Sequence, residues 1–177
     1  SIFNHNICGG KTMNRIYKPF LIATYFLLFL AFTSTSLGQN NYYVSTTGND
    51  GNTGTMPNPW LTISHAITTA AAGDIINVTA GTYNVSYTIT KSITLKGPNF
   101  DINPITGTRV AEATLDGYFN IGAGVSNVVI NGFEFVQVSS AAWERIQFQG
   151  DATNITIKSN RFIHIVRHAI ITNFTFT

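Results

Sequence analysis

A short phrase returns along this chain after 27 residues. It reads NVVINGFEF over residues 127–135 and NITIKSNRF over residues 154–162, with shorter versions earlier as SITLKG (92–97) and ATLDG (113–117). Self-similarity at a period of about 20–50 residues is typical of a solenoid, in which each repeat buries its apolar face against the next. The phrase therefore predicts a stack of short β-strands.

Strand alternation assigns directions to side chains within the phrase. In the first copy we expect Ile130 to point inward and Asn131 outward, with Glu134 outward again after the intervening glycine. In the second copy Lys158 and Arg161 are expected to face solvent. Stacked inward aliphatic and aromatic residues would form the core, and each such side chain contributes about 1.5–3 kcal/mol when buried.

The segments before the repeats contain a helix among strands. Apolar residues at helical spacing over residues 61–72, followed by Gly73, predict an amphipathic helix with a glycine stop. We expect this helix to cover the open end of the first repeat. The other expected elements are strands at 41–45, 74–78 and 87–95, a turn-rich loop at 46–60 and a long polar loop at 97–111.

The first 39 residues differ in composition from the rest. Residues 13–39 have a basic start, an apolar run of 13 residues and a small-residue exit, which together predict a secretory signal peptide. An uncleaved membrane anchor is the alternative, but a bilayer span needs about 20 apolar residues. Residues 1–12 precede the natural-looking start at Met13, and we interpret them as an upstream segment outside the fold. The expected location is extracellular or at the cell surface.

Charge and cysteine content narrow the function classes. The only cysteine, Cys8, lies in the upstream segment, so the mature chain is not a disulfide scaffold. The formal charge of +2 comes from three basic residues before residue 40, where there is no acid. The remainder has seven basic and eight acidic residues, which does not favour nucleic-acid binding.

The chain also resembles a known family. Residues 42–83 carry a YVS strand, a Gly/Asn/Asp loop ending in Pro and an aromatic, an AI helix, and GD followed by INV and AGTY. This stretch resembles the N-terminal module of secreted right-handed parallel β-helix proteins of the pectin-lyase-like superfamily, and residues 89–97 with the two phrases extend the likeness. The resemblance implies a right-handed parallel β-helix with an N-terminal capping α-helix. Residues 40–177 are then expected to be the N-terminal part of that domain, C-terminally incomplete, with a capping module at 41–83 and rungs at 84–177.

Members of this superfamily include pectate, alginate and chondroitin lyases, esterases, glycoside hydrolases and surface proteins without known activity. In the lyases, the resemblance implies a groove on the outside of one sheet, where acidic side chains hold calcium and a Lys or Arg abstracts a proton. Asp116, Glu134 and Asp151 are scattered in this sequence, so we predict no metal ligands. Ca²⁺ is expected as a cofactor only if the full-length protein is a lyase.

One basic cluster offers candidate binding residues. Lys158, Arg161 and Arg167, with His164 and His168 beside them, could meet an acidic polysaccharide, because a guanidinium grips a carboxylate with its fork. The alternative interpretation is a solvated outer face. The sequence does not identify catalytic residues, which are unknown.

Aromatic residues and one loop complete the candidates. Tyr42, Tyr43, Trp60 and Trp143 could stack on sugar rings, although core packing is favoured for Trp60. The loop at 49–52 is interpreted as a plain turn rather than a calcium loop, since it lacks the downstream bidentate acid.

These observations predict a secreted carbohydrate-active or carbohydrate-binding protein, with a polysaccharide lyase acting on an acidic polysaccharide as one form of it. The alternative is a non-catalytic surface adhesin or structural protein, and the residues leave open whether the protein is an enzyme. The expected partner is a polysaccharide or cell-surface glycan, without nucleic acid and without a stable membrane span once the leader is cleaved.

Overall fold

The computed structural model describes residues 38–136, 144–163 and 168–172. All the helices and strands in the described ranges lie within Gln39–Thr177. These elements in chain order are β1 (Asn41–Val44), α2 (Ile63–Thr69), β2 (Ile75–Val78), β3 (Gly81–Ile89), β4 (Ile93–Lys96), β5 (Ala113–Ile121), β6 (Ser126–Asn131), β7 (Glu134–Val136), β8 (Glu144–Phe148), β9 (Thr153–Lys158), β10 (Arg161–Phe162) and β11 (His168–Thr172).

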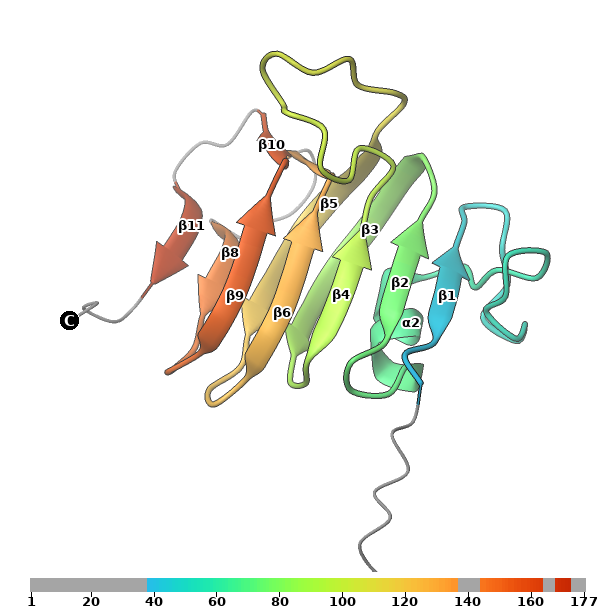
Figure 1. Ribbon diagram of the computed structural model, residues 1–177, viewed down its shortest axis with the longest axis horizontal. Coiled ribbons are helices and arrows are strands. Elements are labelled where there is room, and N and C mark those ends of the chain that lie inside the picture. Colours follow the sequence, from blue (N-terminus) through green and yellow to red (C-terminus); the bar gives the residue numbers. More distant parts are fainter. Residues whose placement is uncertain (1–37, 137–143, 164–167, 173–177) are drawn as a thin grey trace, which may run out of the picture. The chain divides into compact units, whose positions relative to one another are not determined.

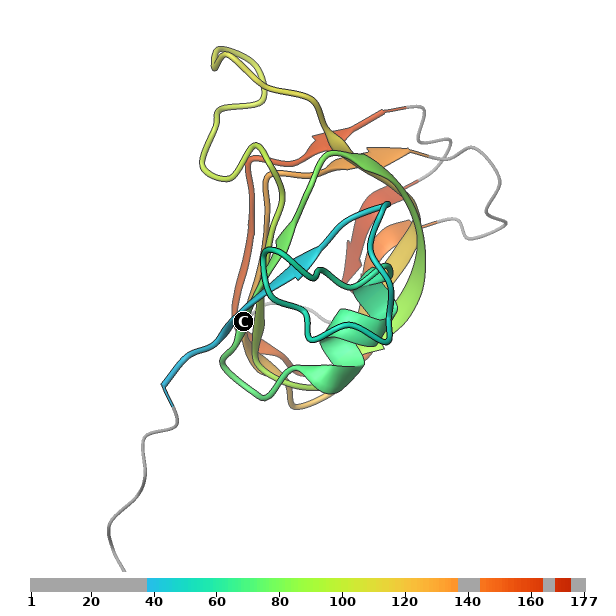
Figure 2. The same ribbon diagram turned by 90° about the vertical axis from the view of Figure 1, so that its right-hand side faces the viewer.

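The strands form two sheets in which the paired strands run parallel. The first sheet has the order β1-β2-β4-β6-β9, and the second has the order β10-β7-β5-β8-β11, with β3 also pairing with β5. Strands that follow one another along the chain mostly alternate between the two sheets (Figure 1). Seen from the end, the two sheets lie on opposite sides of a shared interior (Figure 2). The expectation of a mostly parallel β-protein with little helix is confirmed.

The repeated phrase stacks on itself in register. Ile130 pairs with Ile157, and Phe135 pairs with Phe162, so equivalent positions of the two copies are direct neighbours. The side-chain amide of Asn154 donates to the side-chain oxygen of Asn127, its equivalent 27 residues earlier. The two copies of the phrase therefore lie side by side on neighbouring strands.

Inward side chains fill the interior in ranks. Ile76, Leu95 and Ile130 are fully buried neighbours in the first sheet. In the second sheet the rings of Phe135 and Phe162 stack with centroids 4.9 Å apart and planes 10° from parallel. Burial of each such side chain contributes about 1.5–3 kcal/mol, so the ranks account for much of the driving force for folding.

The helix is shorter than the 61–72 predicted from the sequence. It begins after Thr62, whose hydroxyl accepts a hydrogen bond from the His65 amide, which is the usual N-cap arrangement. It ends before Ala70 because the next amide, that of Ala71, donates to the Asp74 carboxylate instead of continuing the helix. The helix buries Ile63, Ala66 and Ile67, and it packs on β1, β2 and β3 at the β1 end of the sheets (Figure 1).

The loop at 49–52 forms hydrogen bonds with the start of this helix. The Asp50 carboxylate accepts hydrogen bonds from the backbone amides of Leu61 and Thr62 and from the Thr62 hydroxyl. Burial raises the pKa of Asp50, but these hydrogen bonds outweigh it and hold the pKa below its ordinary value. The prediction of a plain turn agrees with this arrangement.

The stretch 87–95, expected as one strand, is two strands in different sheets. β3 ends at Ile89 and β4 begins at Ile93. At the corner, the Lys91 ammonium donates to the carbonyls of Thr68 and Ala70, which are among the last carbonyls of the helix. Alternation of apolar residues across the corner hid the change of sheet, because the pattern continues through it.

The loop after β4 folds back over the first sheet. Its buried anchor is Asn99, whose amide group donates to the Val110 carbonyl and accepts from the Val110 backbone amide. The loop backbone crosses close to Gly132, which has a φ of 86°; a Cβ there would lie 2.3 Å from the Phe100 nitrogen. A glycine is therefore required where the loop passes the turn between β6 and β7.

Candidate functional site

A row of outward side chains crosses the first sheet from β1 to β9. Parallel pairing aligns Tyr43 with Asn77, Asn77 with Lys96, Lys96 with Asn131, and Asn131 with Lys158. We call these five residues the outer row. Neighbouring strands lie about 4.8 Å apart, so the row extends over roughly 19 Å. The residue before each member points inward, which is why alternation sends the whole row to the outer face.

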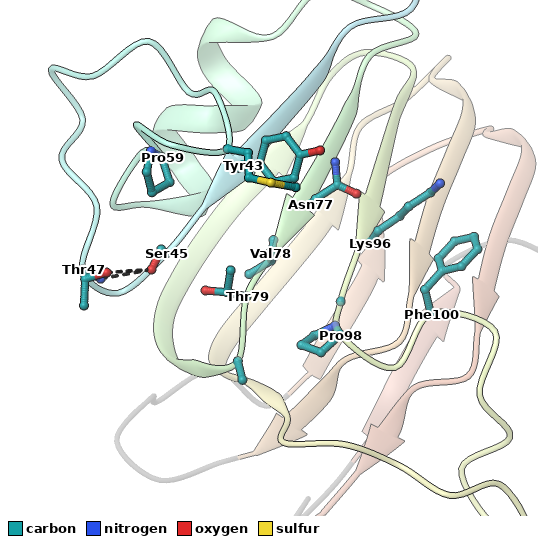
Figure 3. A pocket seen from close by; sticks show the side chains of 13 residues that line it. Tyr43, Ser45, Thr47, Pro59, Asn77, Val78, Thr79, Lys96, Pro98 and Phe100 are labelled. Atoms are coloured by element: carbon teal, nitrogen blue, oxygen red, sulfur yellow. Dashed lines mark hydrogen bonds between the residues drawn. The ribbon is translucent and has the colours of Figure 1, made fainter.

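A groove lies over the first half of the outer row. Its volume is about 680 Å³, and Figure 3 shows Tyr43, Asn77 and Lys96 following one another along its floor. One wall comes from the turn-rich loop between β1 and the helix, and the other comes from the loop after β4 (Figure 3). The wall and end residues are Ser45, Thr47, Met56, Pro59, Val78, Thr79, Ala80, Gly97, Pro98 and Phe100.

The groove combines aromatic, amide and cationic groups. The Lys96 ammonium lies 4.5 Å from the centre of the Phe100 ring, within cation–π range. The Asn77 side-chain nitrogen donates to the Tyr42 carbonyl at 3.1 Å, which holds the amide in place. Tyr43 adds a half-buried ring next to Asn77. A ligand in this groove would meet a flat apolar surface, hydrogen-bonding groups and one positive charge.

The second half of the outer row is covered by the loop after β4. The Asn131 side chain is only 2% exposed, because its amide nitrogen donates to the Asp101 carboxylate at 2.9 Å and its oxygen accepts from the Asp101 backbone amide. The Lys158 ammonium lies 2.8 Å from the same carboxylate. Hydrogen bonds from Lys158 and then from Asn131 hold the pKa of Asp101 below its ordinary value. Asn131 is thus on the outer face, as predicted, but it does not reach solvent.

A network of ion pairs fastens the other end of that loop. Arg109 contacts both carboxylate oxygens of Glu112, at 2.7 and 2.9 Å, and the two side chains are only 9% and 13% exposed. Arg109 also donates to the Ser159 carbonyl, which ties the loop to the end of β9. Burial raises the pKa of Glu112, but the hydrogen bonds and charge of Arg109 outweigh burial and hold it below its ordinary value.

Two of the predicted binding residues, Lys158 and Arg161, lie outside the groove. Lys158 is at the far end of the outer row, paired with Asp101. Arg161, on β10, lies 3.0 Å from Glu134 and 3.5 Å from Glu112, so it belongs to the network that holds the loop. Glu134 points outward as expected but is almost buried by this contact. Arg167 and His164 fall outside the described residues, and the side chain of His168 is not described.

Sequence reasoning named Tyr43 but missed Asn77, Lys96 and Phe100. A signal for Lys96 existed, because it fills the same place in SITLKG that Asn131 and Lys158 fill in the two longer phrases. Aligning the phrases would have shown three members of the row. Of the other aromatics, Trp60 is 3% exposed and stacks on Tyr42 at 4.7 Å, so its core assignment holds. Trp143 lies outside the described residues.

The acidic and histidine side chains of the described residues are dispersed. In that part of the chain, no group of three or more His, Cys, Asp or Glu side chains could hold a metal ion. Ca²⁺ stays a prediction that depends on a lyase activity of the full-length protein.

Comparison with known proteins assigns the chain to a family. It belongs to the DUF1565 family, described as proteins of unknown function, which matches residues 46–177. It is 29% identical over 134 residues to the uncharacterized protein YwoF of Bacillus subtilis (strain 168), a match covering 70% of this chain and 29% of that protein. The chain thus spans less than a third of the length of this curated relative.

A solved structure supports the fold. A rhamnogalacturonan lyase superposes with a TM-score of 0.51 at 19% identity, covering 71% of this chain and 37% of the lyase. At this identity the likeness concerns the fold alone, and it agrees with the pectin-lyase-like resemblance seen in the sequence. Within the ranges that the structure describes, we find no helix with the length and apolar character needed to cross a membrane.

Proposed function

We propose that this protein binds an acidic polysaccharide in the groove on the outer face of its first sheet. The observation that carries the proposal is the open half of the outer row, where Tyr43, Asn77 and Lys96 stand on three successive strands along one groove. The strand spacing of about 4.8 Å is close to the repeat of an extended sugar chain, so successive strands can contact successive sugars.

Each group has a counterpart in an acidic glycan. A pyranose ring has an apolar face that packs on an aromatic ring such as Tyr43, and amide groups such as Asn77 hydrogen-bond to sugar hydroxyls. The Lys96 ammonium would pair with a uronate carboxylate, a charge-assisted contact that is stronger than a neutral hydrogen bond. The remainder after the leader has seven basic and eight acidic residues, so selectivity for an acidic chain comes from the local charge of Lys96 rather than from net charge.

The proposal extends to the whole architecture and location. We interpret residues 40–177 as the N-terminal part of a right-handed parallel β-helix, with 41–83 as a capping module and 84–177 as rungs. The packing of α2 on β1, β2 and β3 supports its role as the cap, since it buries apolar residues at that end. Residues 13–39 would be the signal peptide. Protein recovered from the culture medium should then begin near residue 40 by mass spectrometry; an intact leader on medium-derived protein would contradict this.

The binding proposal is tested with trigalacturonate by calorimetry in about 0.15 M salt, where charges beyond about 8 Å are screened. Lys96→Gln should weaken binding about tenfold or more, since one charged hydrogen bond of about 1.5–3 kcal/mol is lost. Tyr43→Ala should weaken the binding of acidic and methyl-esterified trimers alike. Lys158→Gln is the matched control, because it removes an equal charge from the covered half. Equal affinities for wild type and Lys96→Gln would overturn the proposal.

A second candidate function is polysaccharide lysis, favoured by the fold shared with a rhamnogalacturonan lyase and by the position of Lys96 in the groove. In this reaction Lys96 would act as the base that takes the proton from the carbon next to the sugar carboxylate. The electrons of that C–H bond would form a C=C bond while the bond from the neighbouring carbon to the glycosidic oxygen breaks. The departing oxygen would take a proton from water and leave as a hydroxyl group. Ultraviolet absorbance of unsaturated products from pectate, alginate or chondroitin measures this activity. Binding without such products would favour the non-catalytic surface protein.

A further inference from the structure

The two halves of the outer row have the same chemistry. Asn77 and Lys96, an amide followed by a cation, are repeated on the next two strands as Asn131 and Lys158. The open half presents its pair to the groove, whereas the covered half presents its pair to Asp101 of the loop. A single carboxylate therefore already occupies the second amide–cation pair.

Asp101 binds this pair as a ligand carboxylate would. One of its oxygens accepts from Asn131 at 2.9 Å and from Lys158 at 2.8 Å. Its backbone has a φ of 61°, in the left-handed region that aspartate adopts more readily than most residues.

The contact is open to competition. The Asp101 and Lys158 side chains are 49% and 60% exposed, and exposed ion pairs of this kind contribute little to stability. The loop is held elsewhere by buried groups, namely Asn99 and the Arg109–Glu112 pair. The fold thus positions Asp101 over the pair without depending on the Asp101–Lys158 contact itself.

We propose that Asp101 is a specificity-determining residue that occupies the second amide–cation pair in place of a ligand carboxylate and thereby limits the length of acidic glycan that the outer row can bind. This inference rests on the proposed function of the groove and assigns a subsite to Asn131 and Lys158. The open half covers three strands, about 10 Å, whereas the complete row covers about 19 Å. Short acidic chains fit the open half, and longer ones meet the carboxylate of Asp101.

The test compares oligogalacturonates of two and six units by calorimetry. Asp101→Asn keeps a residue that tolerates positive φ and still bonds to Asn131, but it removes the negative charge, so that Lys158 faces a neutral amide oxygen in place of a carboxylate. We expect the hexamer to bind about tenfold more tightly to this variant than to wild type, the effect of gaining one charge-assisted contact, with the dimer unchanged. Asp101→Gly, which accepts the same φ, should act in the same direction.

Two controls make the result specific. Adding Lys158→Gln to Asp101→Asn should abolish the gain for the hexamer, because the cation is gone. Asp151→Asn removes an exposed carboxylate away from the row and should change neither oligomer. An equal gain for dimer and hexamer, or no gain for either, would overturn the inference while leaving the groove proposal intact. Equal affinities of wild type and Lys96→Gln for trigalacturonate would instead overturn the groove proposal itself.

Discussion

The loop after β4 acts differently on the open and covered halves of the outer row. On the open side the loop contributes a wall, Pro98 and Phe100, and leaves the floor of the groove accessible. On the covered side it contributes a carboxylate, Asp101, that binds the floor directly. The comparison teaches that a repeated surface becomes a defined site where a non-repeated segment is added to it.

The loop after β4 makes two kinds of contact, which should affect different properties of the protein. Its buried contacts, around Asn99 and Arg109, hold the backbone, and its exposed contact at Asp101 is the one that we propose limits ligand length. The first kind should matter for stability and the second for binding. Variants of the two kinds of contact should therefore separate these roles.

Removing the buried Arg109–Glu112 ion pair should have the largest effect on stability. Arg109→Ala leaves Glu112 buried without its bidentate partner, and breaking a buried pair in this way costs about 3–5 kcal/mol. Urea denaturation should show a loss of unfolding free energy of that order. Lys158→Gln, which breaks the exposed pair with Asp101, is the control and should lose much less, because solvent screens that pair. Similar losses for the two variants would show that the loop is not held by its buried end.

A backbone substitution should have an intermediate effect. Gly132→Ala meets both a positive φ of 86° and the Phe100 nitrogen at 2.3 Å, whereas Gly124→Ala meets a positive φ of 72° with no atom within 4 Å. Left-handed backbone strain costs about 1–3 kcal/mol in either case. The steric clash should make Gly132→Ala less stable than Gly124→Ala by about another 2 kcal/mol in chemical denaturation. Equal stabilities would mean that the loop shifts freely over the sheet.

Acidification should distinguish the two carboxylates by a smaller effect. The pKa of Glu112 lies below its ordinary value of 4.5 in the folded state, so its contribution to stability is present above that pH and is lost as the pH falls through the folded pKa. Thermal unfolding midpoints between about pH 6 and pH 3 should therefore fall less steeply for Glu112→Gln than for wild type. The exposed Asp101→Asn variant should flatten the profile less, because solvent screens its interactions. If Asp101→Asn flattened the profile more than Glu112→Gln, the assignment of Glu112 to the buried ion pair that holds the loop would be contradicted.

Much of the fold could be predicted because its determinants are local or periodic. The in–out alternation of the repeated phrase placed Ile130 and Ile157 in the core, and the parallel register confirms that they are neighbours. The corner at residues 90–92 was missed, since the apolar alternation runs through it although the chain changes sheet. The candidate groove was only partly predictable. Its aromatic residue Tyr43 was named. Lys96 became a candidate only because the loop after β4 forms a wall beside it, and no local sequence pattern predicts that wall.

The basic residues show most clearly what the sequence pattern could not predict. Lys158 and Arg161 were correctly expected on the outside, yet both are engaged by acids from distant parts of the sequence. Exposure follows from strand alternation, which is a property of neighbouring residues. Which partner a side chain binds depends on the path of a distant loop. The hydrogen bond between Asp101 and Asn131, for example, joins residues 30 positions apart. Lys158 and Arg161, chosen by charge, pair with acidic side chains of distant segments, and their proposed contact with a polysaccharide stays a prediction.

By itself, the sequence determined the recurring phrase and the inward and outward faces of its strands, because hydrophobic period and side-chain alternation are set within a few residues. The alignment of Tyr43, Asn77 and Lys96 in one row came from the strand register. Only the tertiary structure decided that the row is divided into an open half and a covered half. That decision depends on the path of the loop after β4, which is held by Arg109 and Glu112 near its end and by the glycine that lets it pass at Gly132. Contacts between distant segments leave no periodic trace in a sequence, and for that reason the site became visible only once the chain was folded.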